Sequence, residues 1–126
     1  MILLDTAIVL WWTLNRADLS APALAALHQA DSLAISSISV WEIALKTKKG
    51  KLQLPVTPRE FLARWKRMRN TSILAVTDQI WLTSVELVWS HNDPADRVIV
   101  ATAQLHDASL VTSDLEIQEF FPRTIW

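Results

Sequence analysis

Cysteine is absent from this 126-residue chain, and glycine occurs only once, at Gly50. The lack of cysteine excludes a disulfide scaffold, a thiolate zinc site and a cysteine nucleophile, and it favours a reducing compartment. A single glycine also excludes the phosphate-binding loops GxGxxG and GxxxxGK[ST] and the nucleophile elbow GxSxG. Any chemistry on a phosphate must therefore use other groups.

Long apolar runs are also missing, although 51% of the residues are hydrophobic. The longest uncharged apolar stretch near the N-terminus runs from Thr6 to Leu14, far short of the ~20 residues of a membrane span. Asp5 interrupts the apolar start, where a signal peptide would have a basic segment before an unbroken apolar one. We therefore expect a single soluble, cytoplasmic domain over residues 1–126, with no membrane contact.

The net charge of −1 conceals a segregation of charge along the chain. Residues 46–69 hold nine of the twelve basic residues and one acidic residue, so this segment carries +8 and the remainder −9. Such a segment is either a solvated helix face or a surface that binds a polyanion such as RNA. Our candidates for substrate contact are its first lysines, Lys46, Lys48, Lys49 and Lys51.

Short apolar segments alternate with longer amphipathic segments along the chain. Strands are predicted at residues 1–4, 33–36, 73–76, 109–112 and 124–126. Helices are predicted at residues 6–15 and 21–30, from Ser37 or Ser39 to about 49, at 59–69, from Thr77 or Asp78 onward, at 95–106, and briefly after 114. Apolar strands alternating with helices predict a three-layer α/β/α sandwich around a mostly parallel sheet.

Four acidic residues fall near the carboxyl ends of the predicted strands, where parallel sheets bind their ligands. Asp5 and Asp114 directly follow strands, and Glu42 and Asp96 lie early in helices. Taken singly, the aspartates could be helix N-caps, and Glu42 could pair with Lys46 at i, i+4. Clustered carboxylates stay ionised only beside a compensating cation, so together they predict a Mg²⁺ or Mn²⁺ site.

A magnesium site beside a basic surface suggests phosphodiester cleavage, with the metal activating water and neutralising charge on the phosphate. Two other acidic α/β sites fit poorly. A receiver domain needs paired acids after its first strand and a late lysine, whereas one acid follows here and no lysine follows Lys66. A haloacid-dehalogenase site needs DxD at this point, where the chain reads Asp5-Thr6-Ala7.

The chain resembles the PIN-domain ribonucleases, most closely the VapC-type toxins of toxin–antitoxin pairs. The resemblance spans nearly the whole chain, in the motifs LLDT (3–6), SSISVWEIALKTKKGKL (36–52), HNDPADRVIVATA (91–103) and LVTSD (110–114). It implies an endoribonuclease whose catalytic, metal-binding acids are Asp5, Glu42, Asp96 and Asp114. It also implies supporting positions beside these acids, which are Thr6, Asp93, Arg97 and Ser113. Arg97 would either counter the acids or touch phosphate.

The same resemblance implies partners and leaves alternatives open. VapC-type toxins are usually homodimers, held inactive by a small antitoxin protein whose arm enters the acidic groove. We expect most of the seven tryptophans in the core, and either Trp11 or Trp12 in an interface. One alternative is a PIN-type nuclease of RNA processing or DNA cleavage, which its substrate would distinguish. Another is a catalytically silent module that binds RNA or protein, in which the acids are caps and bind no Mn²⁺.

Overall fold

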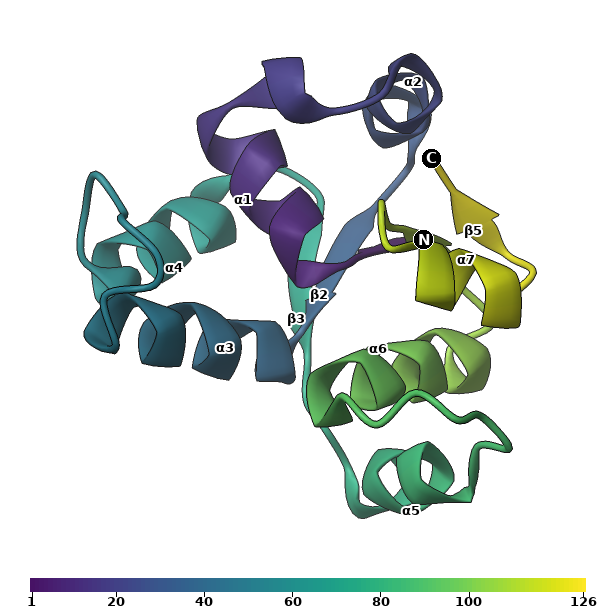
Figure 1. Ribbon diagram of the computed structural model, residues 1–126. Coiled ribbons are helices and arrows are strands. Elements are labelled where there is room, and N and C mark those ends of the chain that lie inside the picture. The colour runs from purple at the N-terminus through teal and green to yellow at the C-terminus, as the bar shows by residue number, and fades with distance from the viewer.

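The computed structural model, which describes residues 1–126, is built around a five-stranded sheet (Figure 1). Its strands are β1 (Ile2–Leu4), β2 (Leu33–Ser36), β3 (Thr71–Leu74), β4 (Ser109–Val111) and β5 (Thr124–Ile125). They lie in the order β3-β2-β1-β4-β5, and every neighbouring pair is parallel. Leu4 of β1 is in register with Ile35 and Val111. The carboxyl ends of the three central strands are therefore aligned, and the segments that follow these strands lie together at one edge of the sheet.

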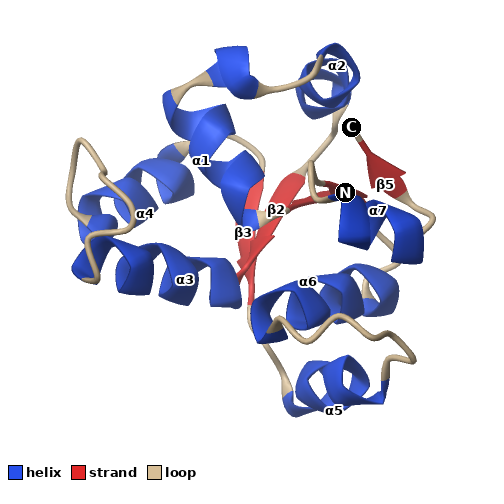
Figure 2. Cartoon of the chain, viewed as in Figure 1, coloured by secondary structure: helices blue, strands red, loops and turns tan.

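Helices cover both faces of this sheet (Figure 2). One face is covered by α1 (Thr6–Leu14), α2 (Ala21–Gln29) and α4 (Pro58–Arg67). The other is covered by α5 (Asp78–Glu86), α6 (Pro94–Leu105) and α7 (Leu115–Phe120). A helix at the sheet edge, α3 (Ser37–Lys48), contributes to both layers, and a 3₁₀ turn (Arg16–Asp18) follows α1. The predicted three-layer α/β/α sandwich is confirmed, with a sheet that is wholly parallel. None of these helices has the length and hydropathy needed to cross a bilayer.

Adjacent residues in the central strands supply two separate cores. Leu3 and Leu110 pack on the side of α6, whereas Leu4 and Val111 pack on the side of α1. Both sides of each strand are therefore buried, which is why these strands read as continuous apolar runs without polar alternation.

Most boundaries differ from the sequence prediction by one or two residues, and two of these differences have a clear local cause. Strand β3 lies two residues earlier than expected, because its ladder with β2 ends where Leu74 pairs with Ser36. The chain then leaves the sheet, and the Val76 amide donates to Ser37 Oγ instead. Helix α3 is capped by Ser36 rather than by Ser37 or Ser39, since the Ser36 hydroxyl accepts from the Ile38 amide.

The tryptophans depart furthest from prediction. Only Trp12 and Trp65 of the seven are buried, whereas Trp41 and Trp81 are 59% and 49% exposed. Helical periodicity shows which residues share a face, but it does not show whether another element covers that face. Trp41 belongs to α3 and Trp81 to α5, the helices that follow β2 and β3 at the carboxyl edge of the sheet (Figure 1).

Candidate metal centre

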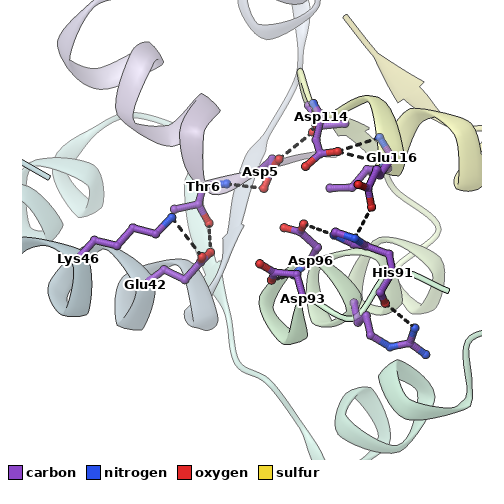
Figure 3. Close-up of polar contacts among 12 residues, drawn as sticks. Asp5, Thr6, Glu42, Lys46, His91, Asp93, Asp96, Asp114 and Glu116 are labelled. Carbon is purple, nitrogen blue, oxygen red and sulfur yellow. Dashed lines mark hydrogen bonds and ion pairs between the residues drawn. The ribbon is translucent and has the colours of Figure 1, made fainter. Parts of the chain in front are cut away.

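Acidic side chains from four separate segments gather at the carboxyl edge of the sheet (Figure 3). Asp5 follows β1, Glu42 projects from α3, Asp96 lies in the first turn of α6, and Asp114 follows β4. Figure 3 shows these side chains turned toward a common region. Connections between parallel strands bring remote segments together in this way, since each crossover returns to the same edge.

Asp5 is the most enclosed of these acids, with 8% of its surface exposed. Its Oδ1 accepts from the Thr6 amide at 2.8 Å, and its Oδ2 accepts from the Thr112 hydroxyl at 2.7 Å. Burial raises the pKa of Asp5 above its ordinary value despite these hydrogen bonds, and the charges of Glu42 and Asp114 add to the rise. A bound cation would relieve the cost of this buried charge.

Glu42 is oriented from two sides. Thr6 Oγ1 donates to its Oε1 at 2.6 Å and also contacts the Ser39 hydroxyl at 2.8 Å. The ammonium of Lys46 lies 3.5 Å from Glu42 Oε2, one helical turn along α3. The i, i+4 pair expected from the sequence is therefore present, and it does not prevent Glu42 from facing the other acids (Figure 3).

Thr112, rather than Ser113, supplies the hydroxyl on the β4 side of the site. Its side chain is fully buried, donates to Asp5 and accepts from the Asp114 amide at 3.1 Å. The hydroxyl of Ser113 makes no hydrogen bond within the chain. The parallel register of β1 with β4 decides between these neighbours, since Leu4 pairs with Val111 and the next residues are Asp5 and Thr112.

Three of the aspartates are helix N-caps. Asp5 caps α1, Asp93 caps α6 by accepting from the Asp96 amide at 3.0 Å, and Asp114 caps α7 by accepting from the Glu116 amide at 2.8 Å. For Asp93 and Asp114, capping uses Oδ1 and leaves Oδ2 without a hydrogen bond within the chain. A cap and a metal ligand can therefore be the same residue, acting through different oxygens.

Asp96 does not cap a helix, and its carboxylate meets an imidazole that the sequence did not single out. Asp96 Oδ2 is 2.7 Å from His91 Nε2, and His91 Nδ1 contacts Glu116 Oε2. Burial raises the pKa of Asp96 to about 7, against the lowering effect of the His91 hydrogen bond. That hydrogen bond is the main reason why the pKa of His91 is raised as well.

The donor set fits a divalent cation. Carboxylate oxygens of Asp96 and Asp114 lie within 4.8 Å of each other, and a ring nitrogen of His91 lies within the same distance of both. The buried carboxylate of Asp5 is close enough to raise the pKa of Asp96, and the charge of Asp114 raises the pKa of Asp5 in turn. Carboxylate oxygens are hard ligands that suit Mg²⁺ and Mn²⁺, and the absence of thiolates disfavours softer metals.

Arg97 is turned away from the acids, contrary to both roles that the motif suggested. All five of its N–H groups are directed at backbone carbonyls, at distances of 2.7–3.2 Å. The acceptors are the carbonyl oxygens of Ser84, Val85, Leu87, Trp89 and His91. Arg97 thus closes the C-terminal end of α5 and holds the following loop, with no N–H left for a carboxylate or a phosphate.

The candidate substrate lysines are distributed along α3. Lys46 lies beside Glu42, whereas Lys48, Lys49 and Lys51 lie at or beyond the opposite end of the helix. At a rise of ~1.5 Å per residue, Lys49 is about 10 Å farther along the axis than Glu42. The basic residues of α4 are exposed while its Phe61 and Trp65 are buried. The α4 part of the basic segment is therefore a solvated face beyond α3 (Figure 1).

Comparison with known proteins adds to this geometry. Residues 2–120 match the sequence profile of the PIN domain. The chain is 33% identical to Ribonuclease VapC22 of Mycobacterium tuberculosis (strain ATCC 25618 / H37Rv) over 129 aligned positions, covering 99% of this chain and 98% of that protein. A toxin–antitoxin complex from Klebsiella pneumoniae shares the fold with a TM-score of 0.69 and 23% identity, covering 100% of this chain and 97% of the other. VapBC2 from Rickettsia felis, bound to a DNA fragment from its promoter, has a TM-score of 0.66 and 20% identity, with both chains covered completely.

Proposed function

The chain belongs to the PIN-domain family, and from this we propose that it is a metal-dependent endoribonuclease that acts as the toxin of a toxin–antitoxin pair. The observation that carries the proposal is the convergence of Asp5, Glu42, Asp96 and Asp114 at one sheet edge (Figure 3). The named relative, a ribonuclease, matches along the whole chain. We expect the protein to act in the cytoplasm, where its RNA substrate would be found.

The four acids would hold the metal, and the rest of the site keeps them in place. A bound Mg²⁺ or Mn²⁺ would supply Lewis-acid activation of water and would neutralise charge that develops on the phosphate. Thr6 and Thr112 fix both oxygens of Asp5, and Thr6 also fixes Glu42. Carboxylates that are oriented before the cation arrives lose little freedom on binding, which favours affinity and correct geometry.

The lysines of α3 would contact the RNA backbone. Lys46 is about half exposed beside Glu42, so we propose that its ammonium would contact a phosphate bound at the acidic site. Lys48, Lys49 and Lys51 are farther from the acids and would contact flanking phosphates. Backbone contacts of this kind are electrostatic, so we expect RNA affinity to fall as salt concentration rises.

We also propose two protein partners. Relatives of this fold occur in toxin–antitoxin complexes, and the acidic cluster would accept a basic side chain from a small antitoxin. A homodimer would use the exposed apolar surface of α3 and α5, in particular Trp41, Trp81 and Val85. This surface borders a cavity of about 490 Å³ that is lined mainly by apolar side chains. An exposed apolar patch of this kind is typical of a protein interface.

A catalytically silent RNA- or protein-binding module is the competing function. The N-cap roles of Asp5, Asp93 and Asp114 favour it, because they give those acids a purely structural use. Binding of Mn²⁺ distinguishes the two functions, since caps alone do not form a metal site. A PIN-type nuclease of RNA processing or of DNA cleavage would bind the metal and differ only in its substrate.

The test uses purified protein freed of any partner and incubated with total cellular RNA. We expect discrete fragments with Mg²⁺ or Mn²⁺ and intact RNA with excess EDTA. Asp5→Asn should abolish cleavage, whereas Asp31→Asn, at the opposite edge of the sheet, should not. Parallel incubations with single-stranded and duplex DNA test the DNA alternative. Intact RNA together with no Mn²⁺ binding by the folded protein would overturn the proposal.

A further inference from the structure

His91 connects two helices at the acidic site. It lies in the segment between α5 and α6, and its ring stands between Asp96 and Glu116 (Figure 3). Its Nε2 is hydrogen-bonded to Asp96 Oδ2 at 2.7 Å, and its Nδ1 contacts Glu116 Oε2 on α7. Both ring nitrogens therefore engage carboxylates, one on each helix.

The ring is held in this position by its surroundings. It packs against Trp89 with 4.8 Å between ring centroids, and Trp89 stacks on Phe120 at 4.5 Å and an interplanar angle of 7°. Arg97 donates to the carbonyl oxygens of Trp89 and His91 at 2.8 and 3.0 Å. The side chain of His91 is only 18% exposed. These contacts restrict the ring of His91, which is therefore not free to rotate as an exposed surface histidine would be.

Asp96 depends on this support for its orientation. Its carboxylate has no hydrogen-bond partner other than His91. The charged groups that bear on it are Asp93 at the start of the same helix and Asp5 and Asp114 from other segments, and all three repel it. Without the imidazole, no attractive contact would select one rotamer of Asp96. Figure 3 shows the second carboxylate oxygen of Asp96 facing away from His91, toward the other acids.

We propose that His91 is a positioning residue of the metal centre, which holds one oxygen of Asp96 and so presents the other to the cation. Glu116 completes the arrangement by fixing the far side of the ring. The inference rests on the proposed function, since it assumes that Asp96 is a metal ligand. His91 itself is not a ligand in this arrangement, because both of its nitrogens are engaged and the carboxylates offer the hard oxygens that Mg²⁺ prefers.

The test is a titration with Mn²⁺ of the unmodified protein, His91→Ala and His91→Gln. Calorimetry and electron paramagnetic resonance monitor the binding. His91→Ala removes both contacts of the ring. In His91→Gln, the side-chain amide can still donate to Asp96. Loss of a group that orients a metal ligand typically costs 10- to 100-fold in affinity. We therefore expect the Kd for Mn²⁺ to rise by about that factor in His91→Ala and to rise less in His91→Gln.

Cleavage of RNA supplies a second readout. We expect kcat to fall in His91→Ala while KM for RNA stays unchanged, because His91 does not face the lysines of α3. His106→Ala is the matched control, since His106 is exposed at the end of α6 and contacts none of the acids. Circular dichroism of each variant establishes that it is folded. Should His91→Ala fail to fold, the comparison of His91→Gln with the unmodified protein carries the test.

Two results would overturn this inference alone. An unchanged or tighter Kd for Mn²⁺ in folded His91→Ala and His91→Gln would show that the imidazole does not support the site. Nitrogen coupling in the pulsed spectrum of bound Mn²⁺, absent from His91→Ala, would show that His91 is a ligand. If the unmodified protein binds Mn²⁺ but cleaves no RNA, the nuclease proposal fails while the Kd comparison still decides the role of His91. If the unmodified protein binds no Mn²⁺, both proposals fail.

Discussion

Thr112 donates its hydroxyl to Asp5 Oδ2 across 2.7 Å, joining two residues that are 107 positions apart in the sequence. The same hydroxyl accepts from the Asp114 amide at 3.1 Å. One buried side chain thus sets the position of two of the four acids. Because the contact follows from the pairing of β1 with β4, the register of the sheet determines the geometry of the site.

Replacing Thr112 by valine should damage both the fold and the site. Thr112→Val keeps the shape of the side chain but leaves Asp5 Oδ2 and the Asp114 amide without their partner. Burying an unsatisfied polar group costs ~1–3 kcal/mol, so we expect the free energy of unfolding to fall by about that amount. Urea denaturation measures this loss, and Mn²⁺ titration should show weaker binding.

Two further variants make this prediction specific. Thr112→Ser keeps the hydroxyl and should retain most of the stability and the Mn²⁺ affinity. Ser113→Ala removes the neighbouring hydroxyl, which has no partner within the chain, and should change neither quantity. A larger effect of Ser113→Ala than of Thr112→Val would contradict the register-based assignment.

The metal-free protein should lose stability as pH rises. Burial raises the pKa of Asp96 from 3.8 to about 7, and the pKa of His91 is raised above 6.5 by its hydrogen bond with Asp96. Between pH 4 and 7 the folded protein therefore holds protons that the unfolded chain has released. Stability is linked to that difference and decreases with increasing pH over this range. Thermal unfolding in EDTA from pH 5 to 8 should show a falling Tm.

Mn²⁺ and an Asp96 variant provide the controls for this pH dependence. A cation replaces the protons, so the increase in Tm caused by Mn²⁺ should be larger at pH 8 than at pH 5. Asp96→Asn removes one of the coupled groups and should flatten the profile in EDTA. A Tm in EDTA that rises between pH 5 and 8 would show that the acids are not held as the structure has them.

The sequence predicted the four acids and one of the residues that orient them, Thr6, but it did not predict the roles of Thr112 and His91. Asp5 and Asp114 could be placed because they follow apolar strands, and the strands of a parallel sheet end at one edge. Thr112 could not be distinguished from Ser113, since their positions relative to Asp5 depend on register. His91 stands in the motif quoted from the sequence, but nothing in that motif indicates that its ring reaches both Asp96 and Glu116.

The directions of the Arg97 and Trp81 side chains could not be predicted from the sequence for a related reason. Arg97 follows Asp96 directly, and this proximity in sequence suggested a role near the acids. Along a helix, however, neighbouring residues point about 100° apart, so Arg97 faces the end of α5 instead. Likewise, Trp81 follows the buried Ile80 but points to solvent. Side-chain direction across a tertiary contact is set by packing that no local pattern records.

Arg97→Lys should destabilise the protein although the substitution keeps the positive charge. Lysine has three donors on one nitrogen and cannot satisfy the five carbonyl contacts that the guanidinium makes. We expect a loss of about 2–4 kcal/mol in the free energy of unfolding, since each lost contact is partly replaced by water. If Arg97 bound phosphate instead, Arg97→Lys would keep the stability and would weaken RNA binding at low salt, which filter binding would detect.

The exposed face of α5 provides the last prediction, which concerns the homodimer. Val85 is 78% exposed, so an aspartate at this position costs little in the folded monomer but would be buried without a partner in a dimer interface. We expect the unmodified protein to sediment as a dimer at micromolar concentration and Val85→Asp to sediment as a monomer that circular dichroism shows to be folded. Leu14→Asp, on α1 across the sheet, is the control and should remain dimeric. A monomeric unmodified protein would contradict the homodimer. A dimer that Leu14→Asp disrupts and Val85→Asp does not would exclude α5 as the interface.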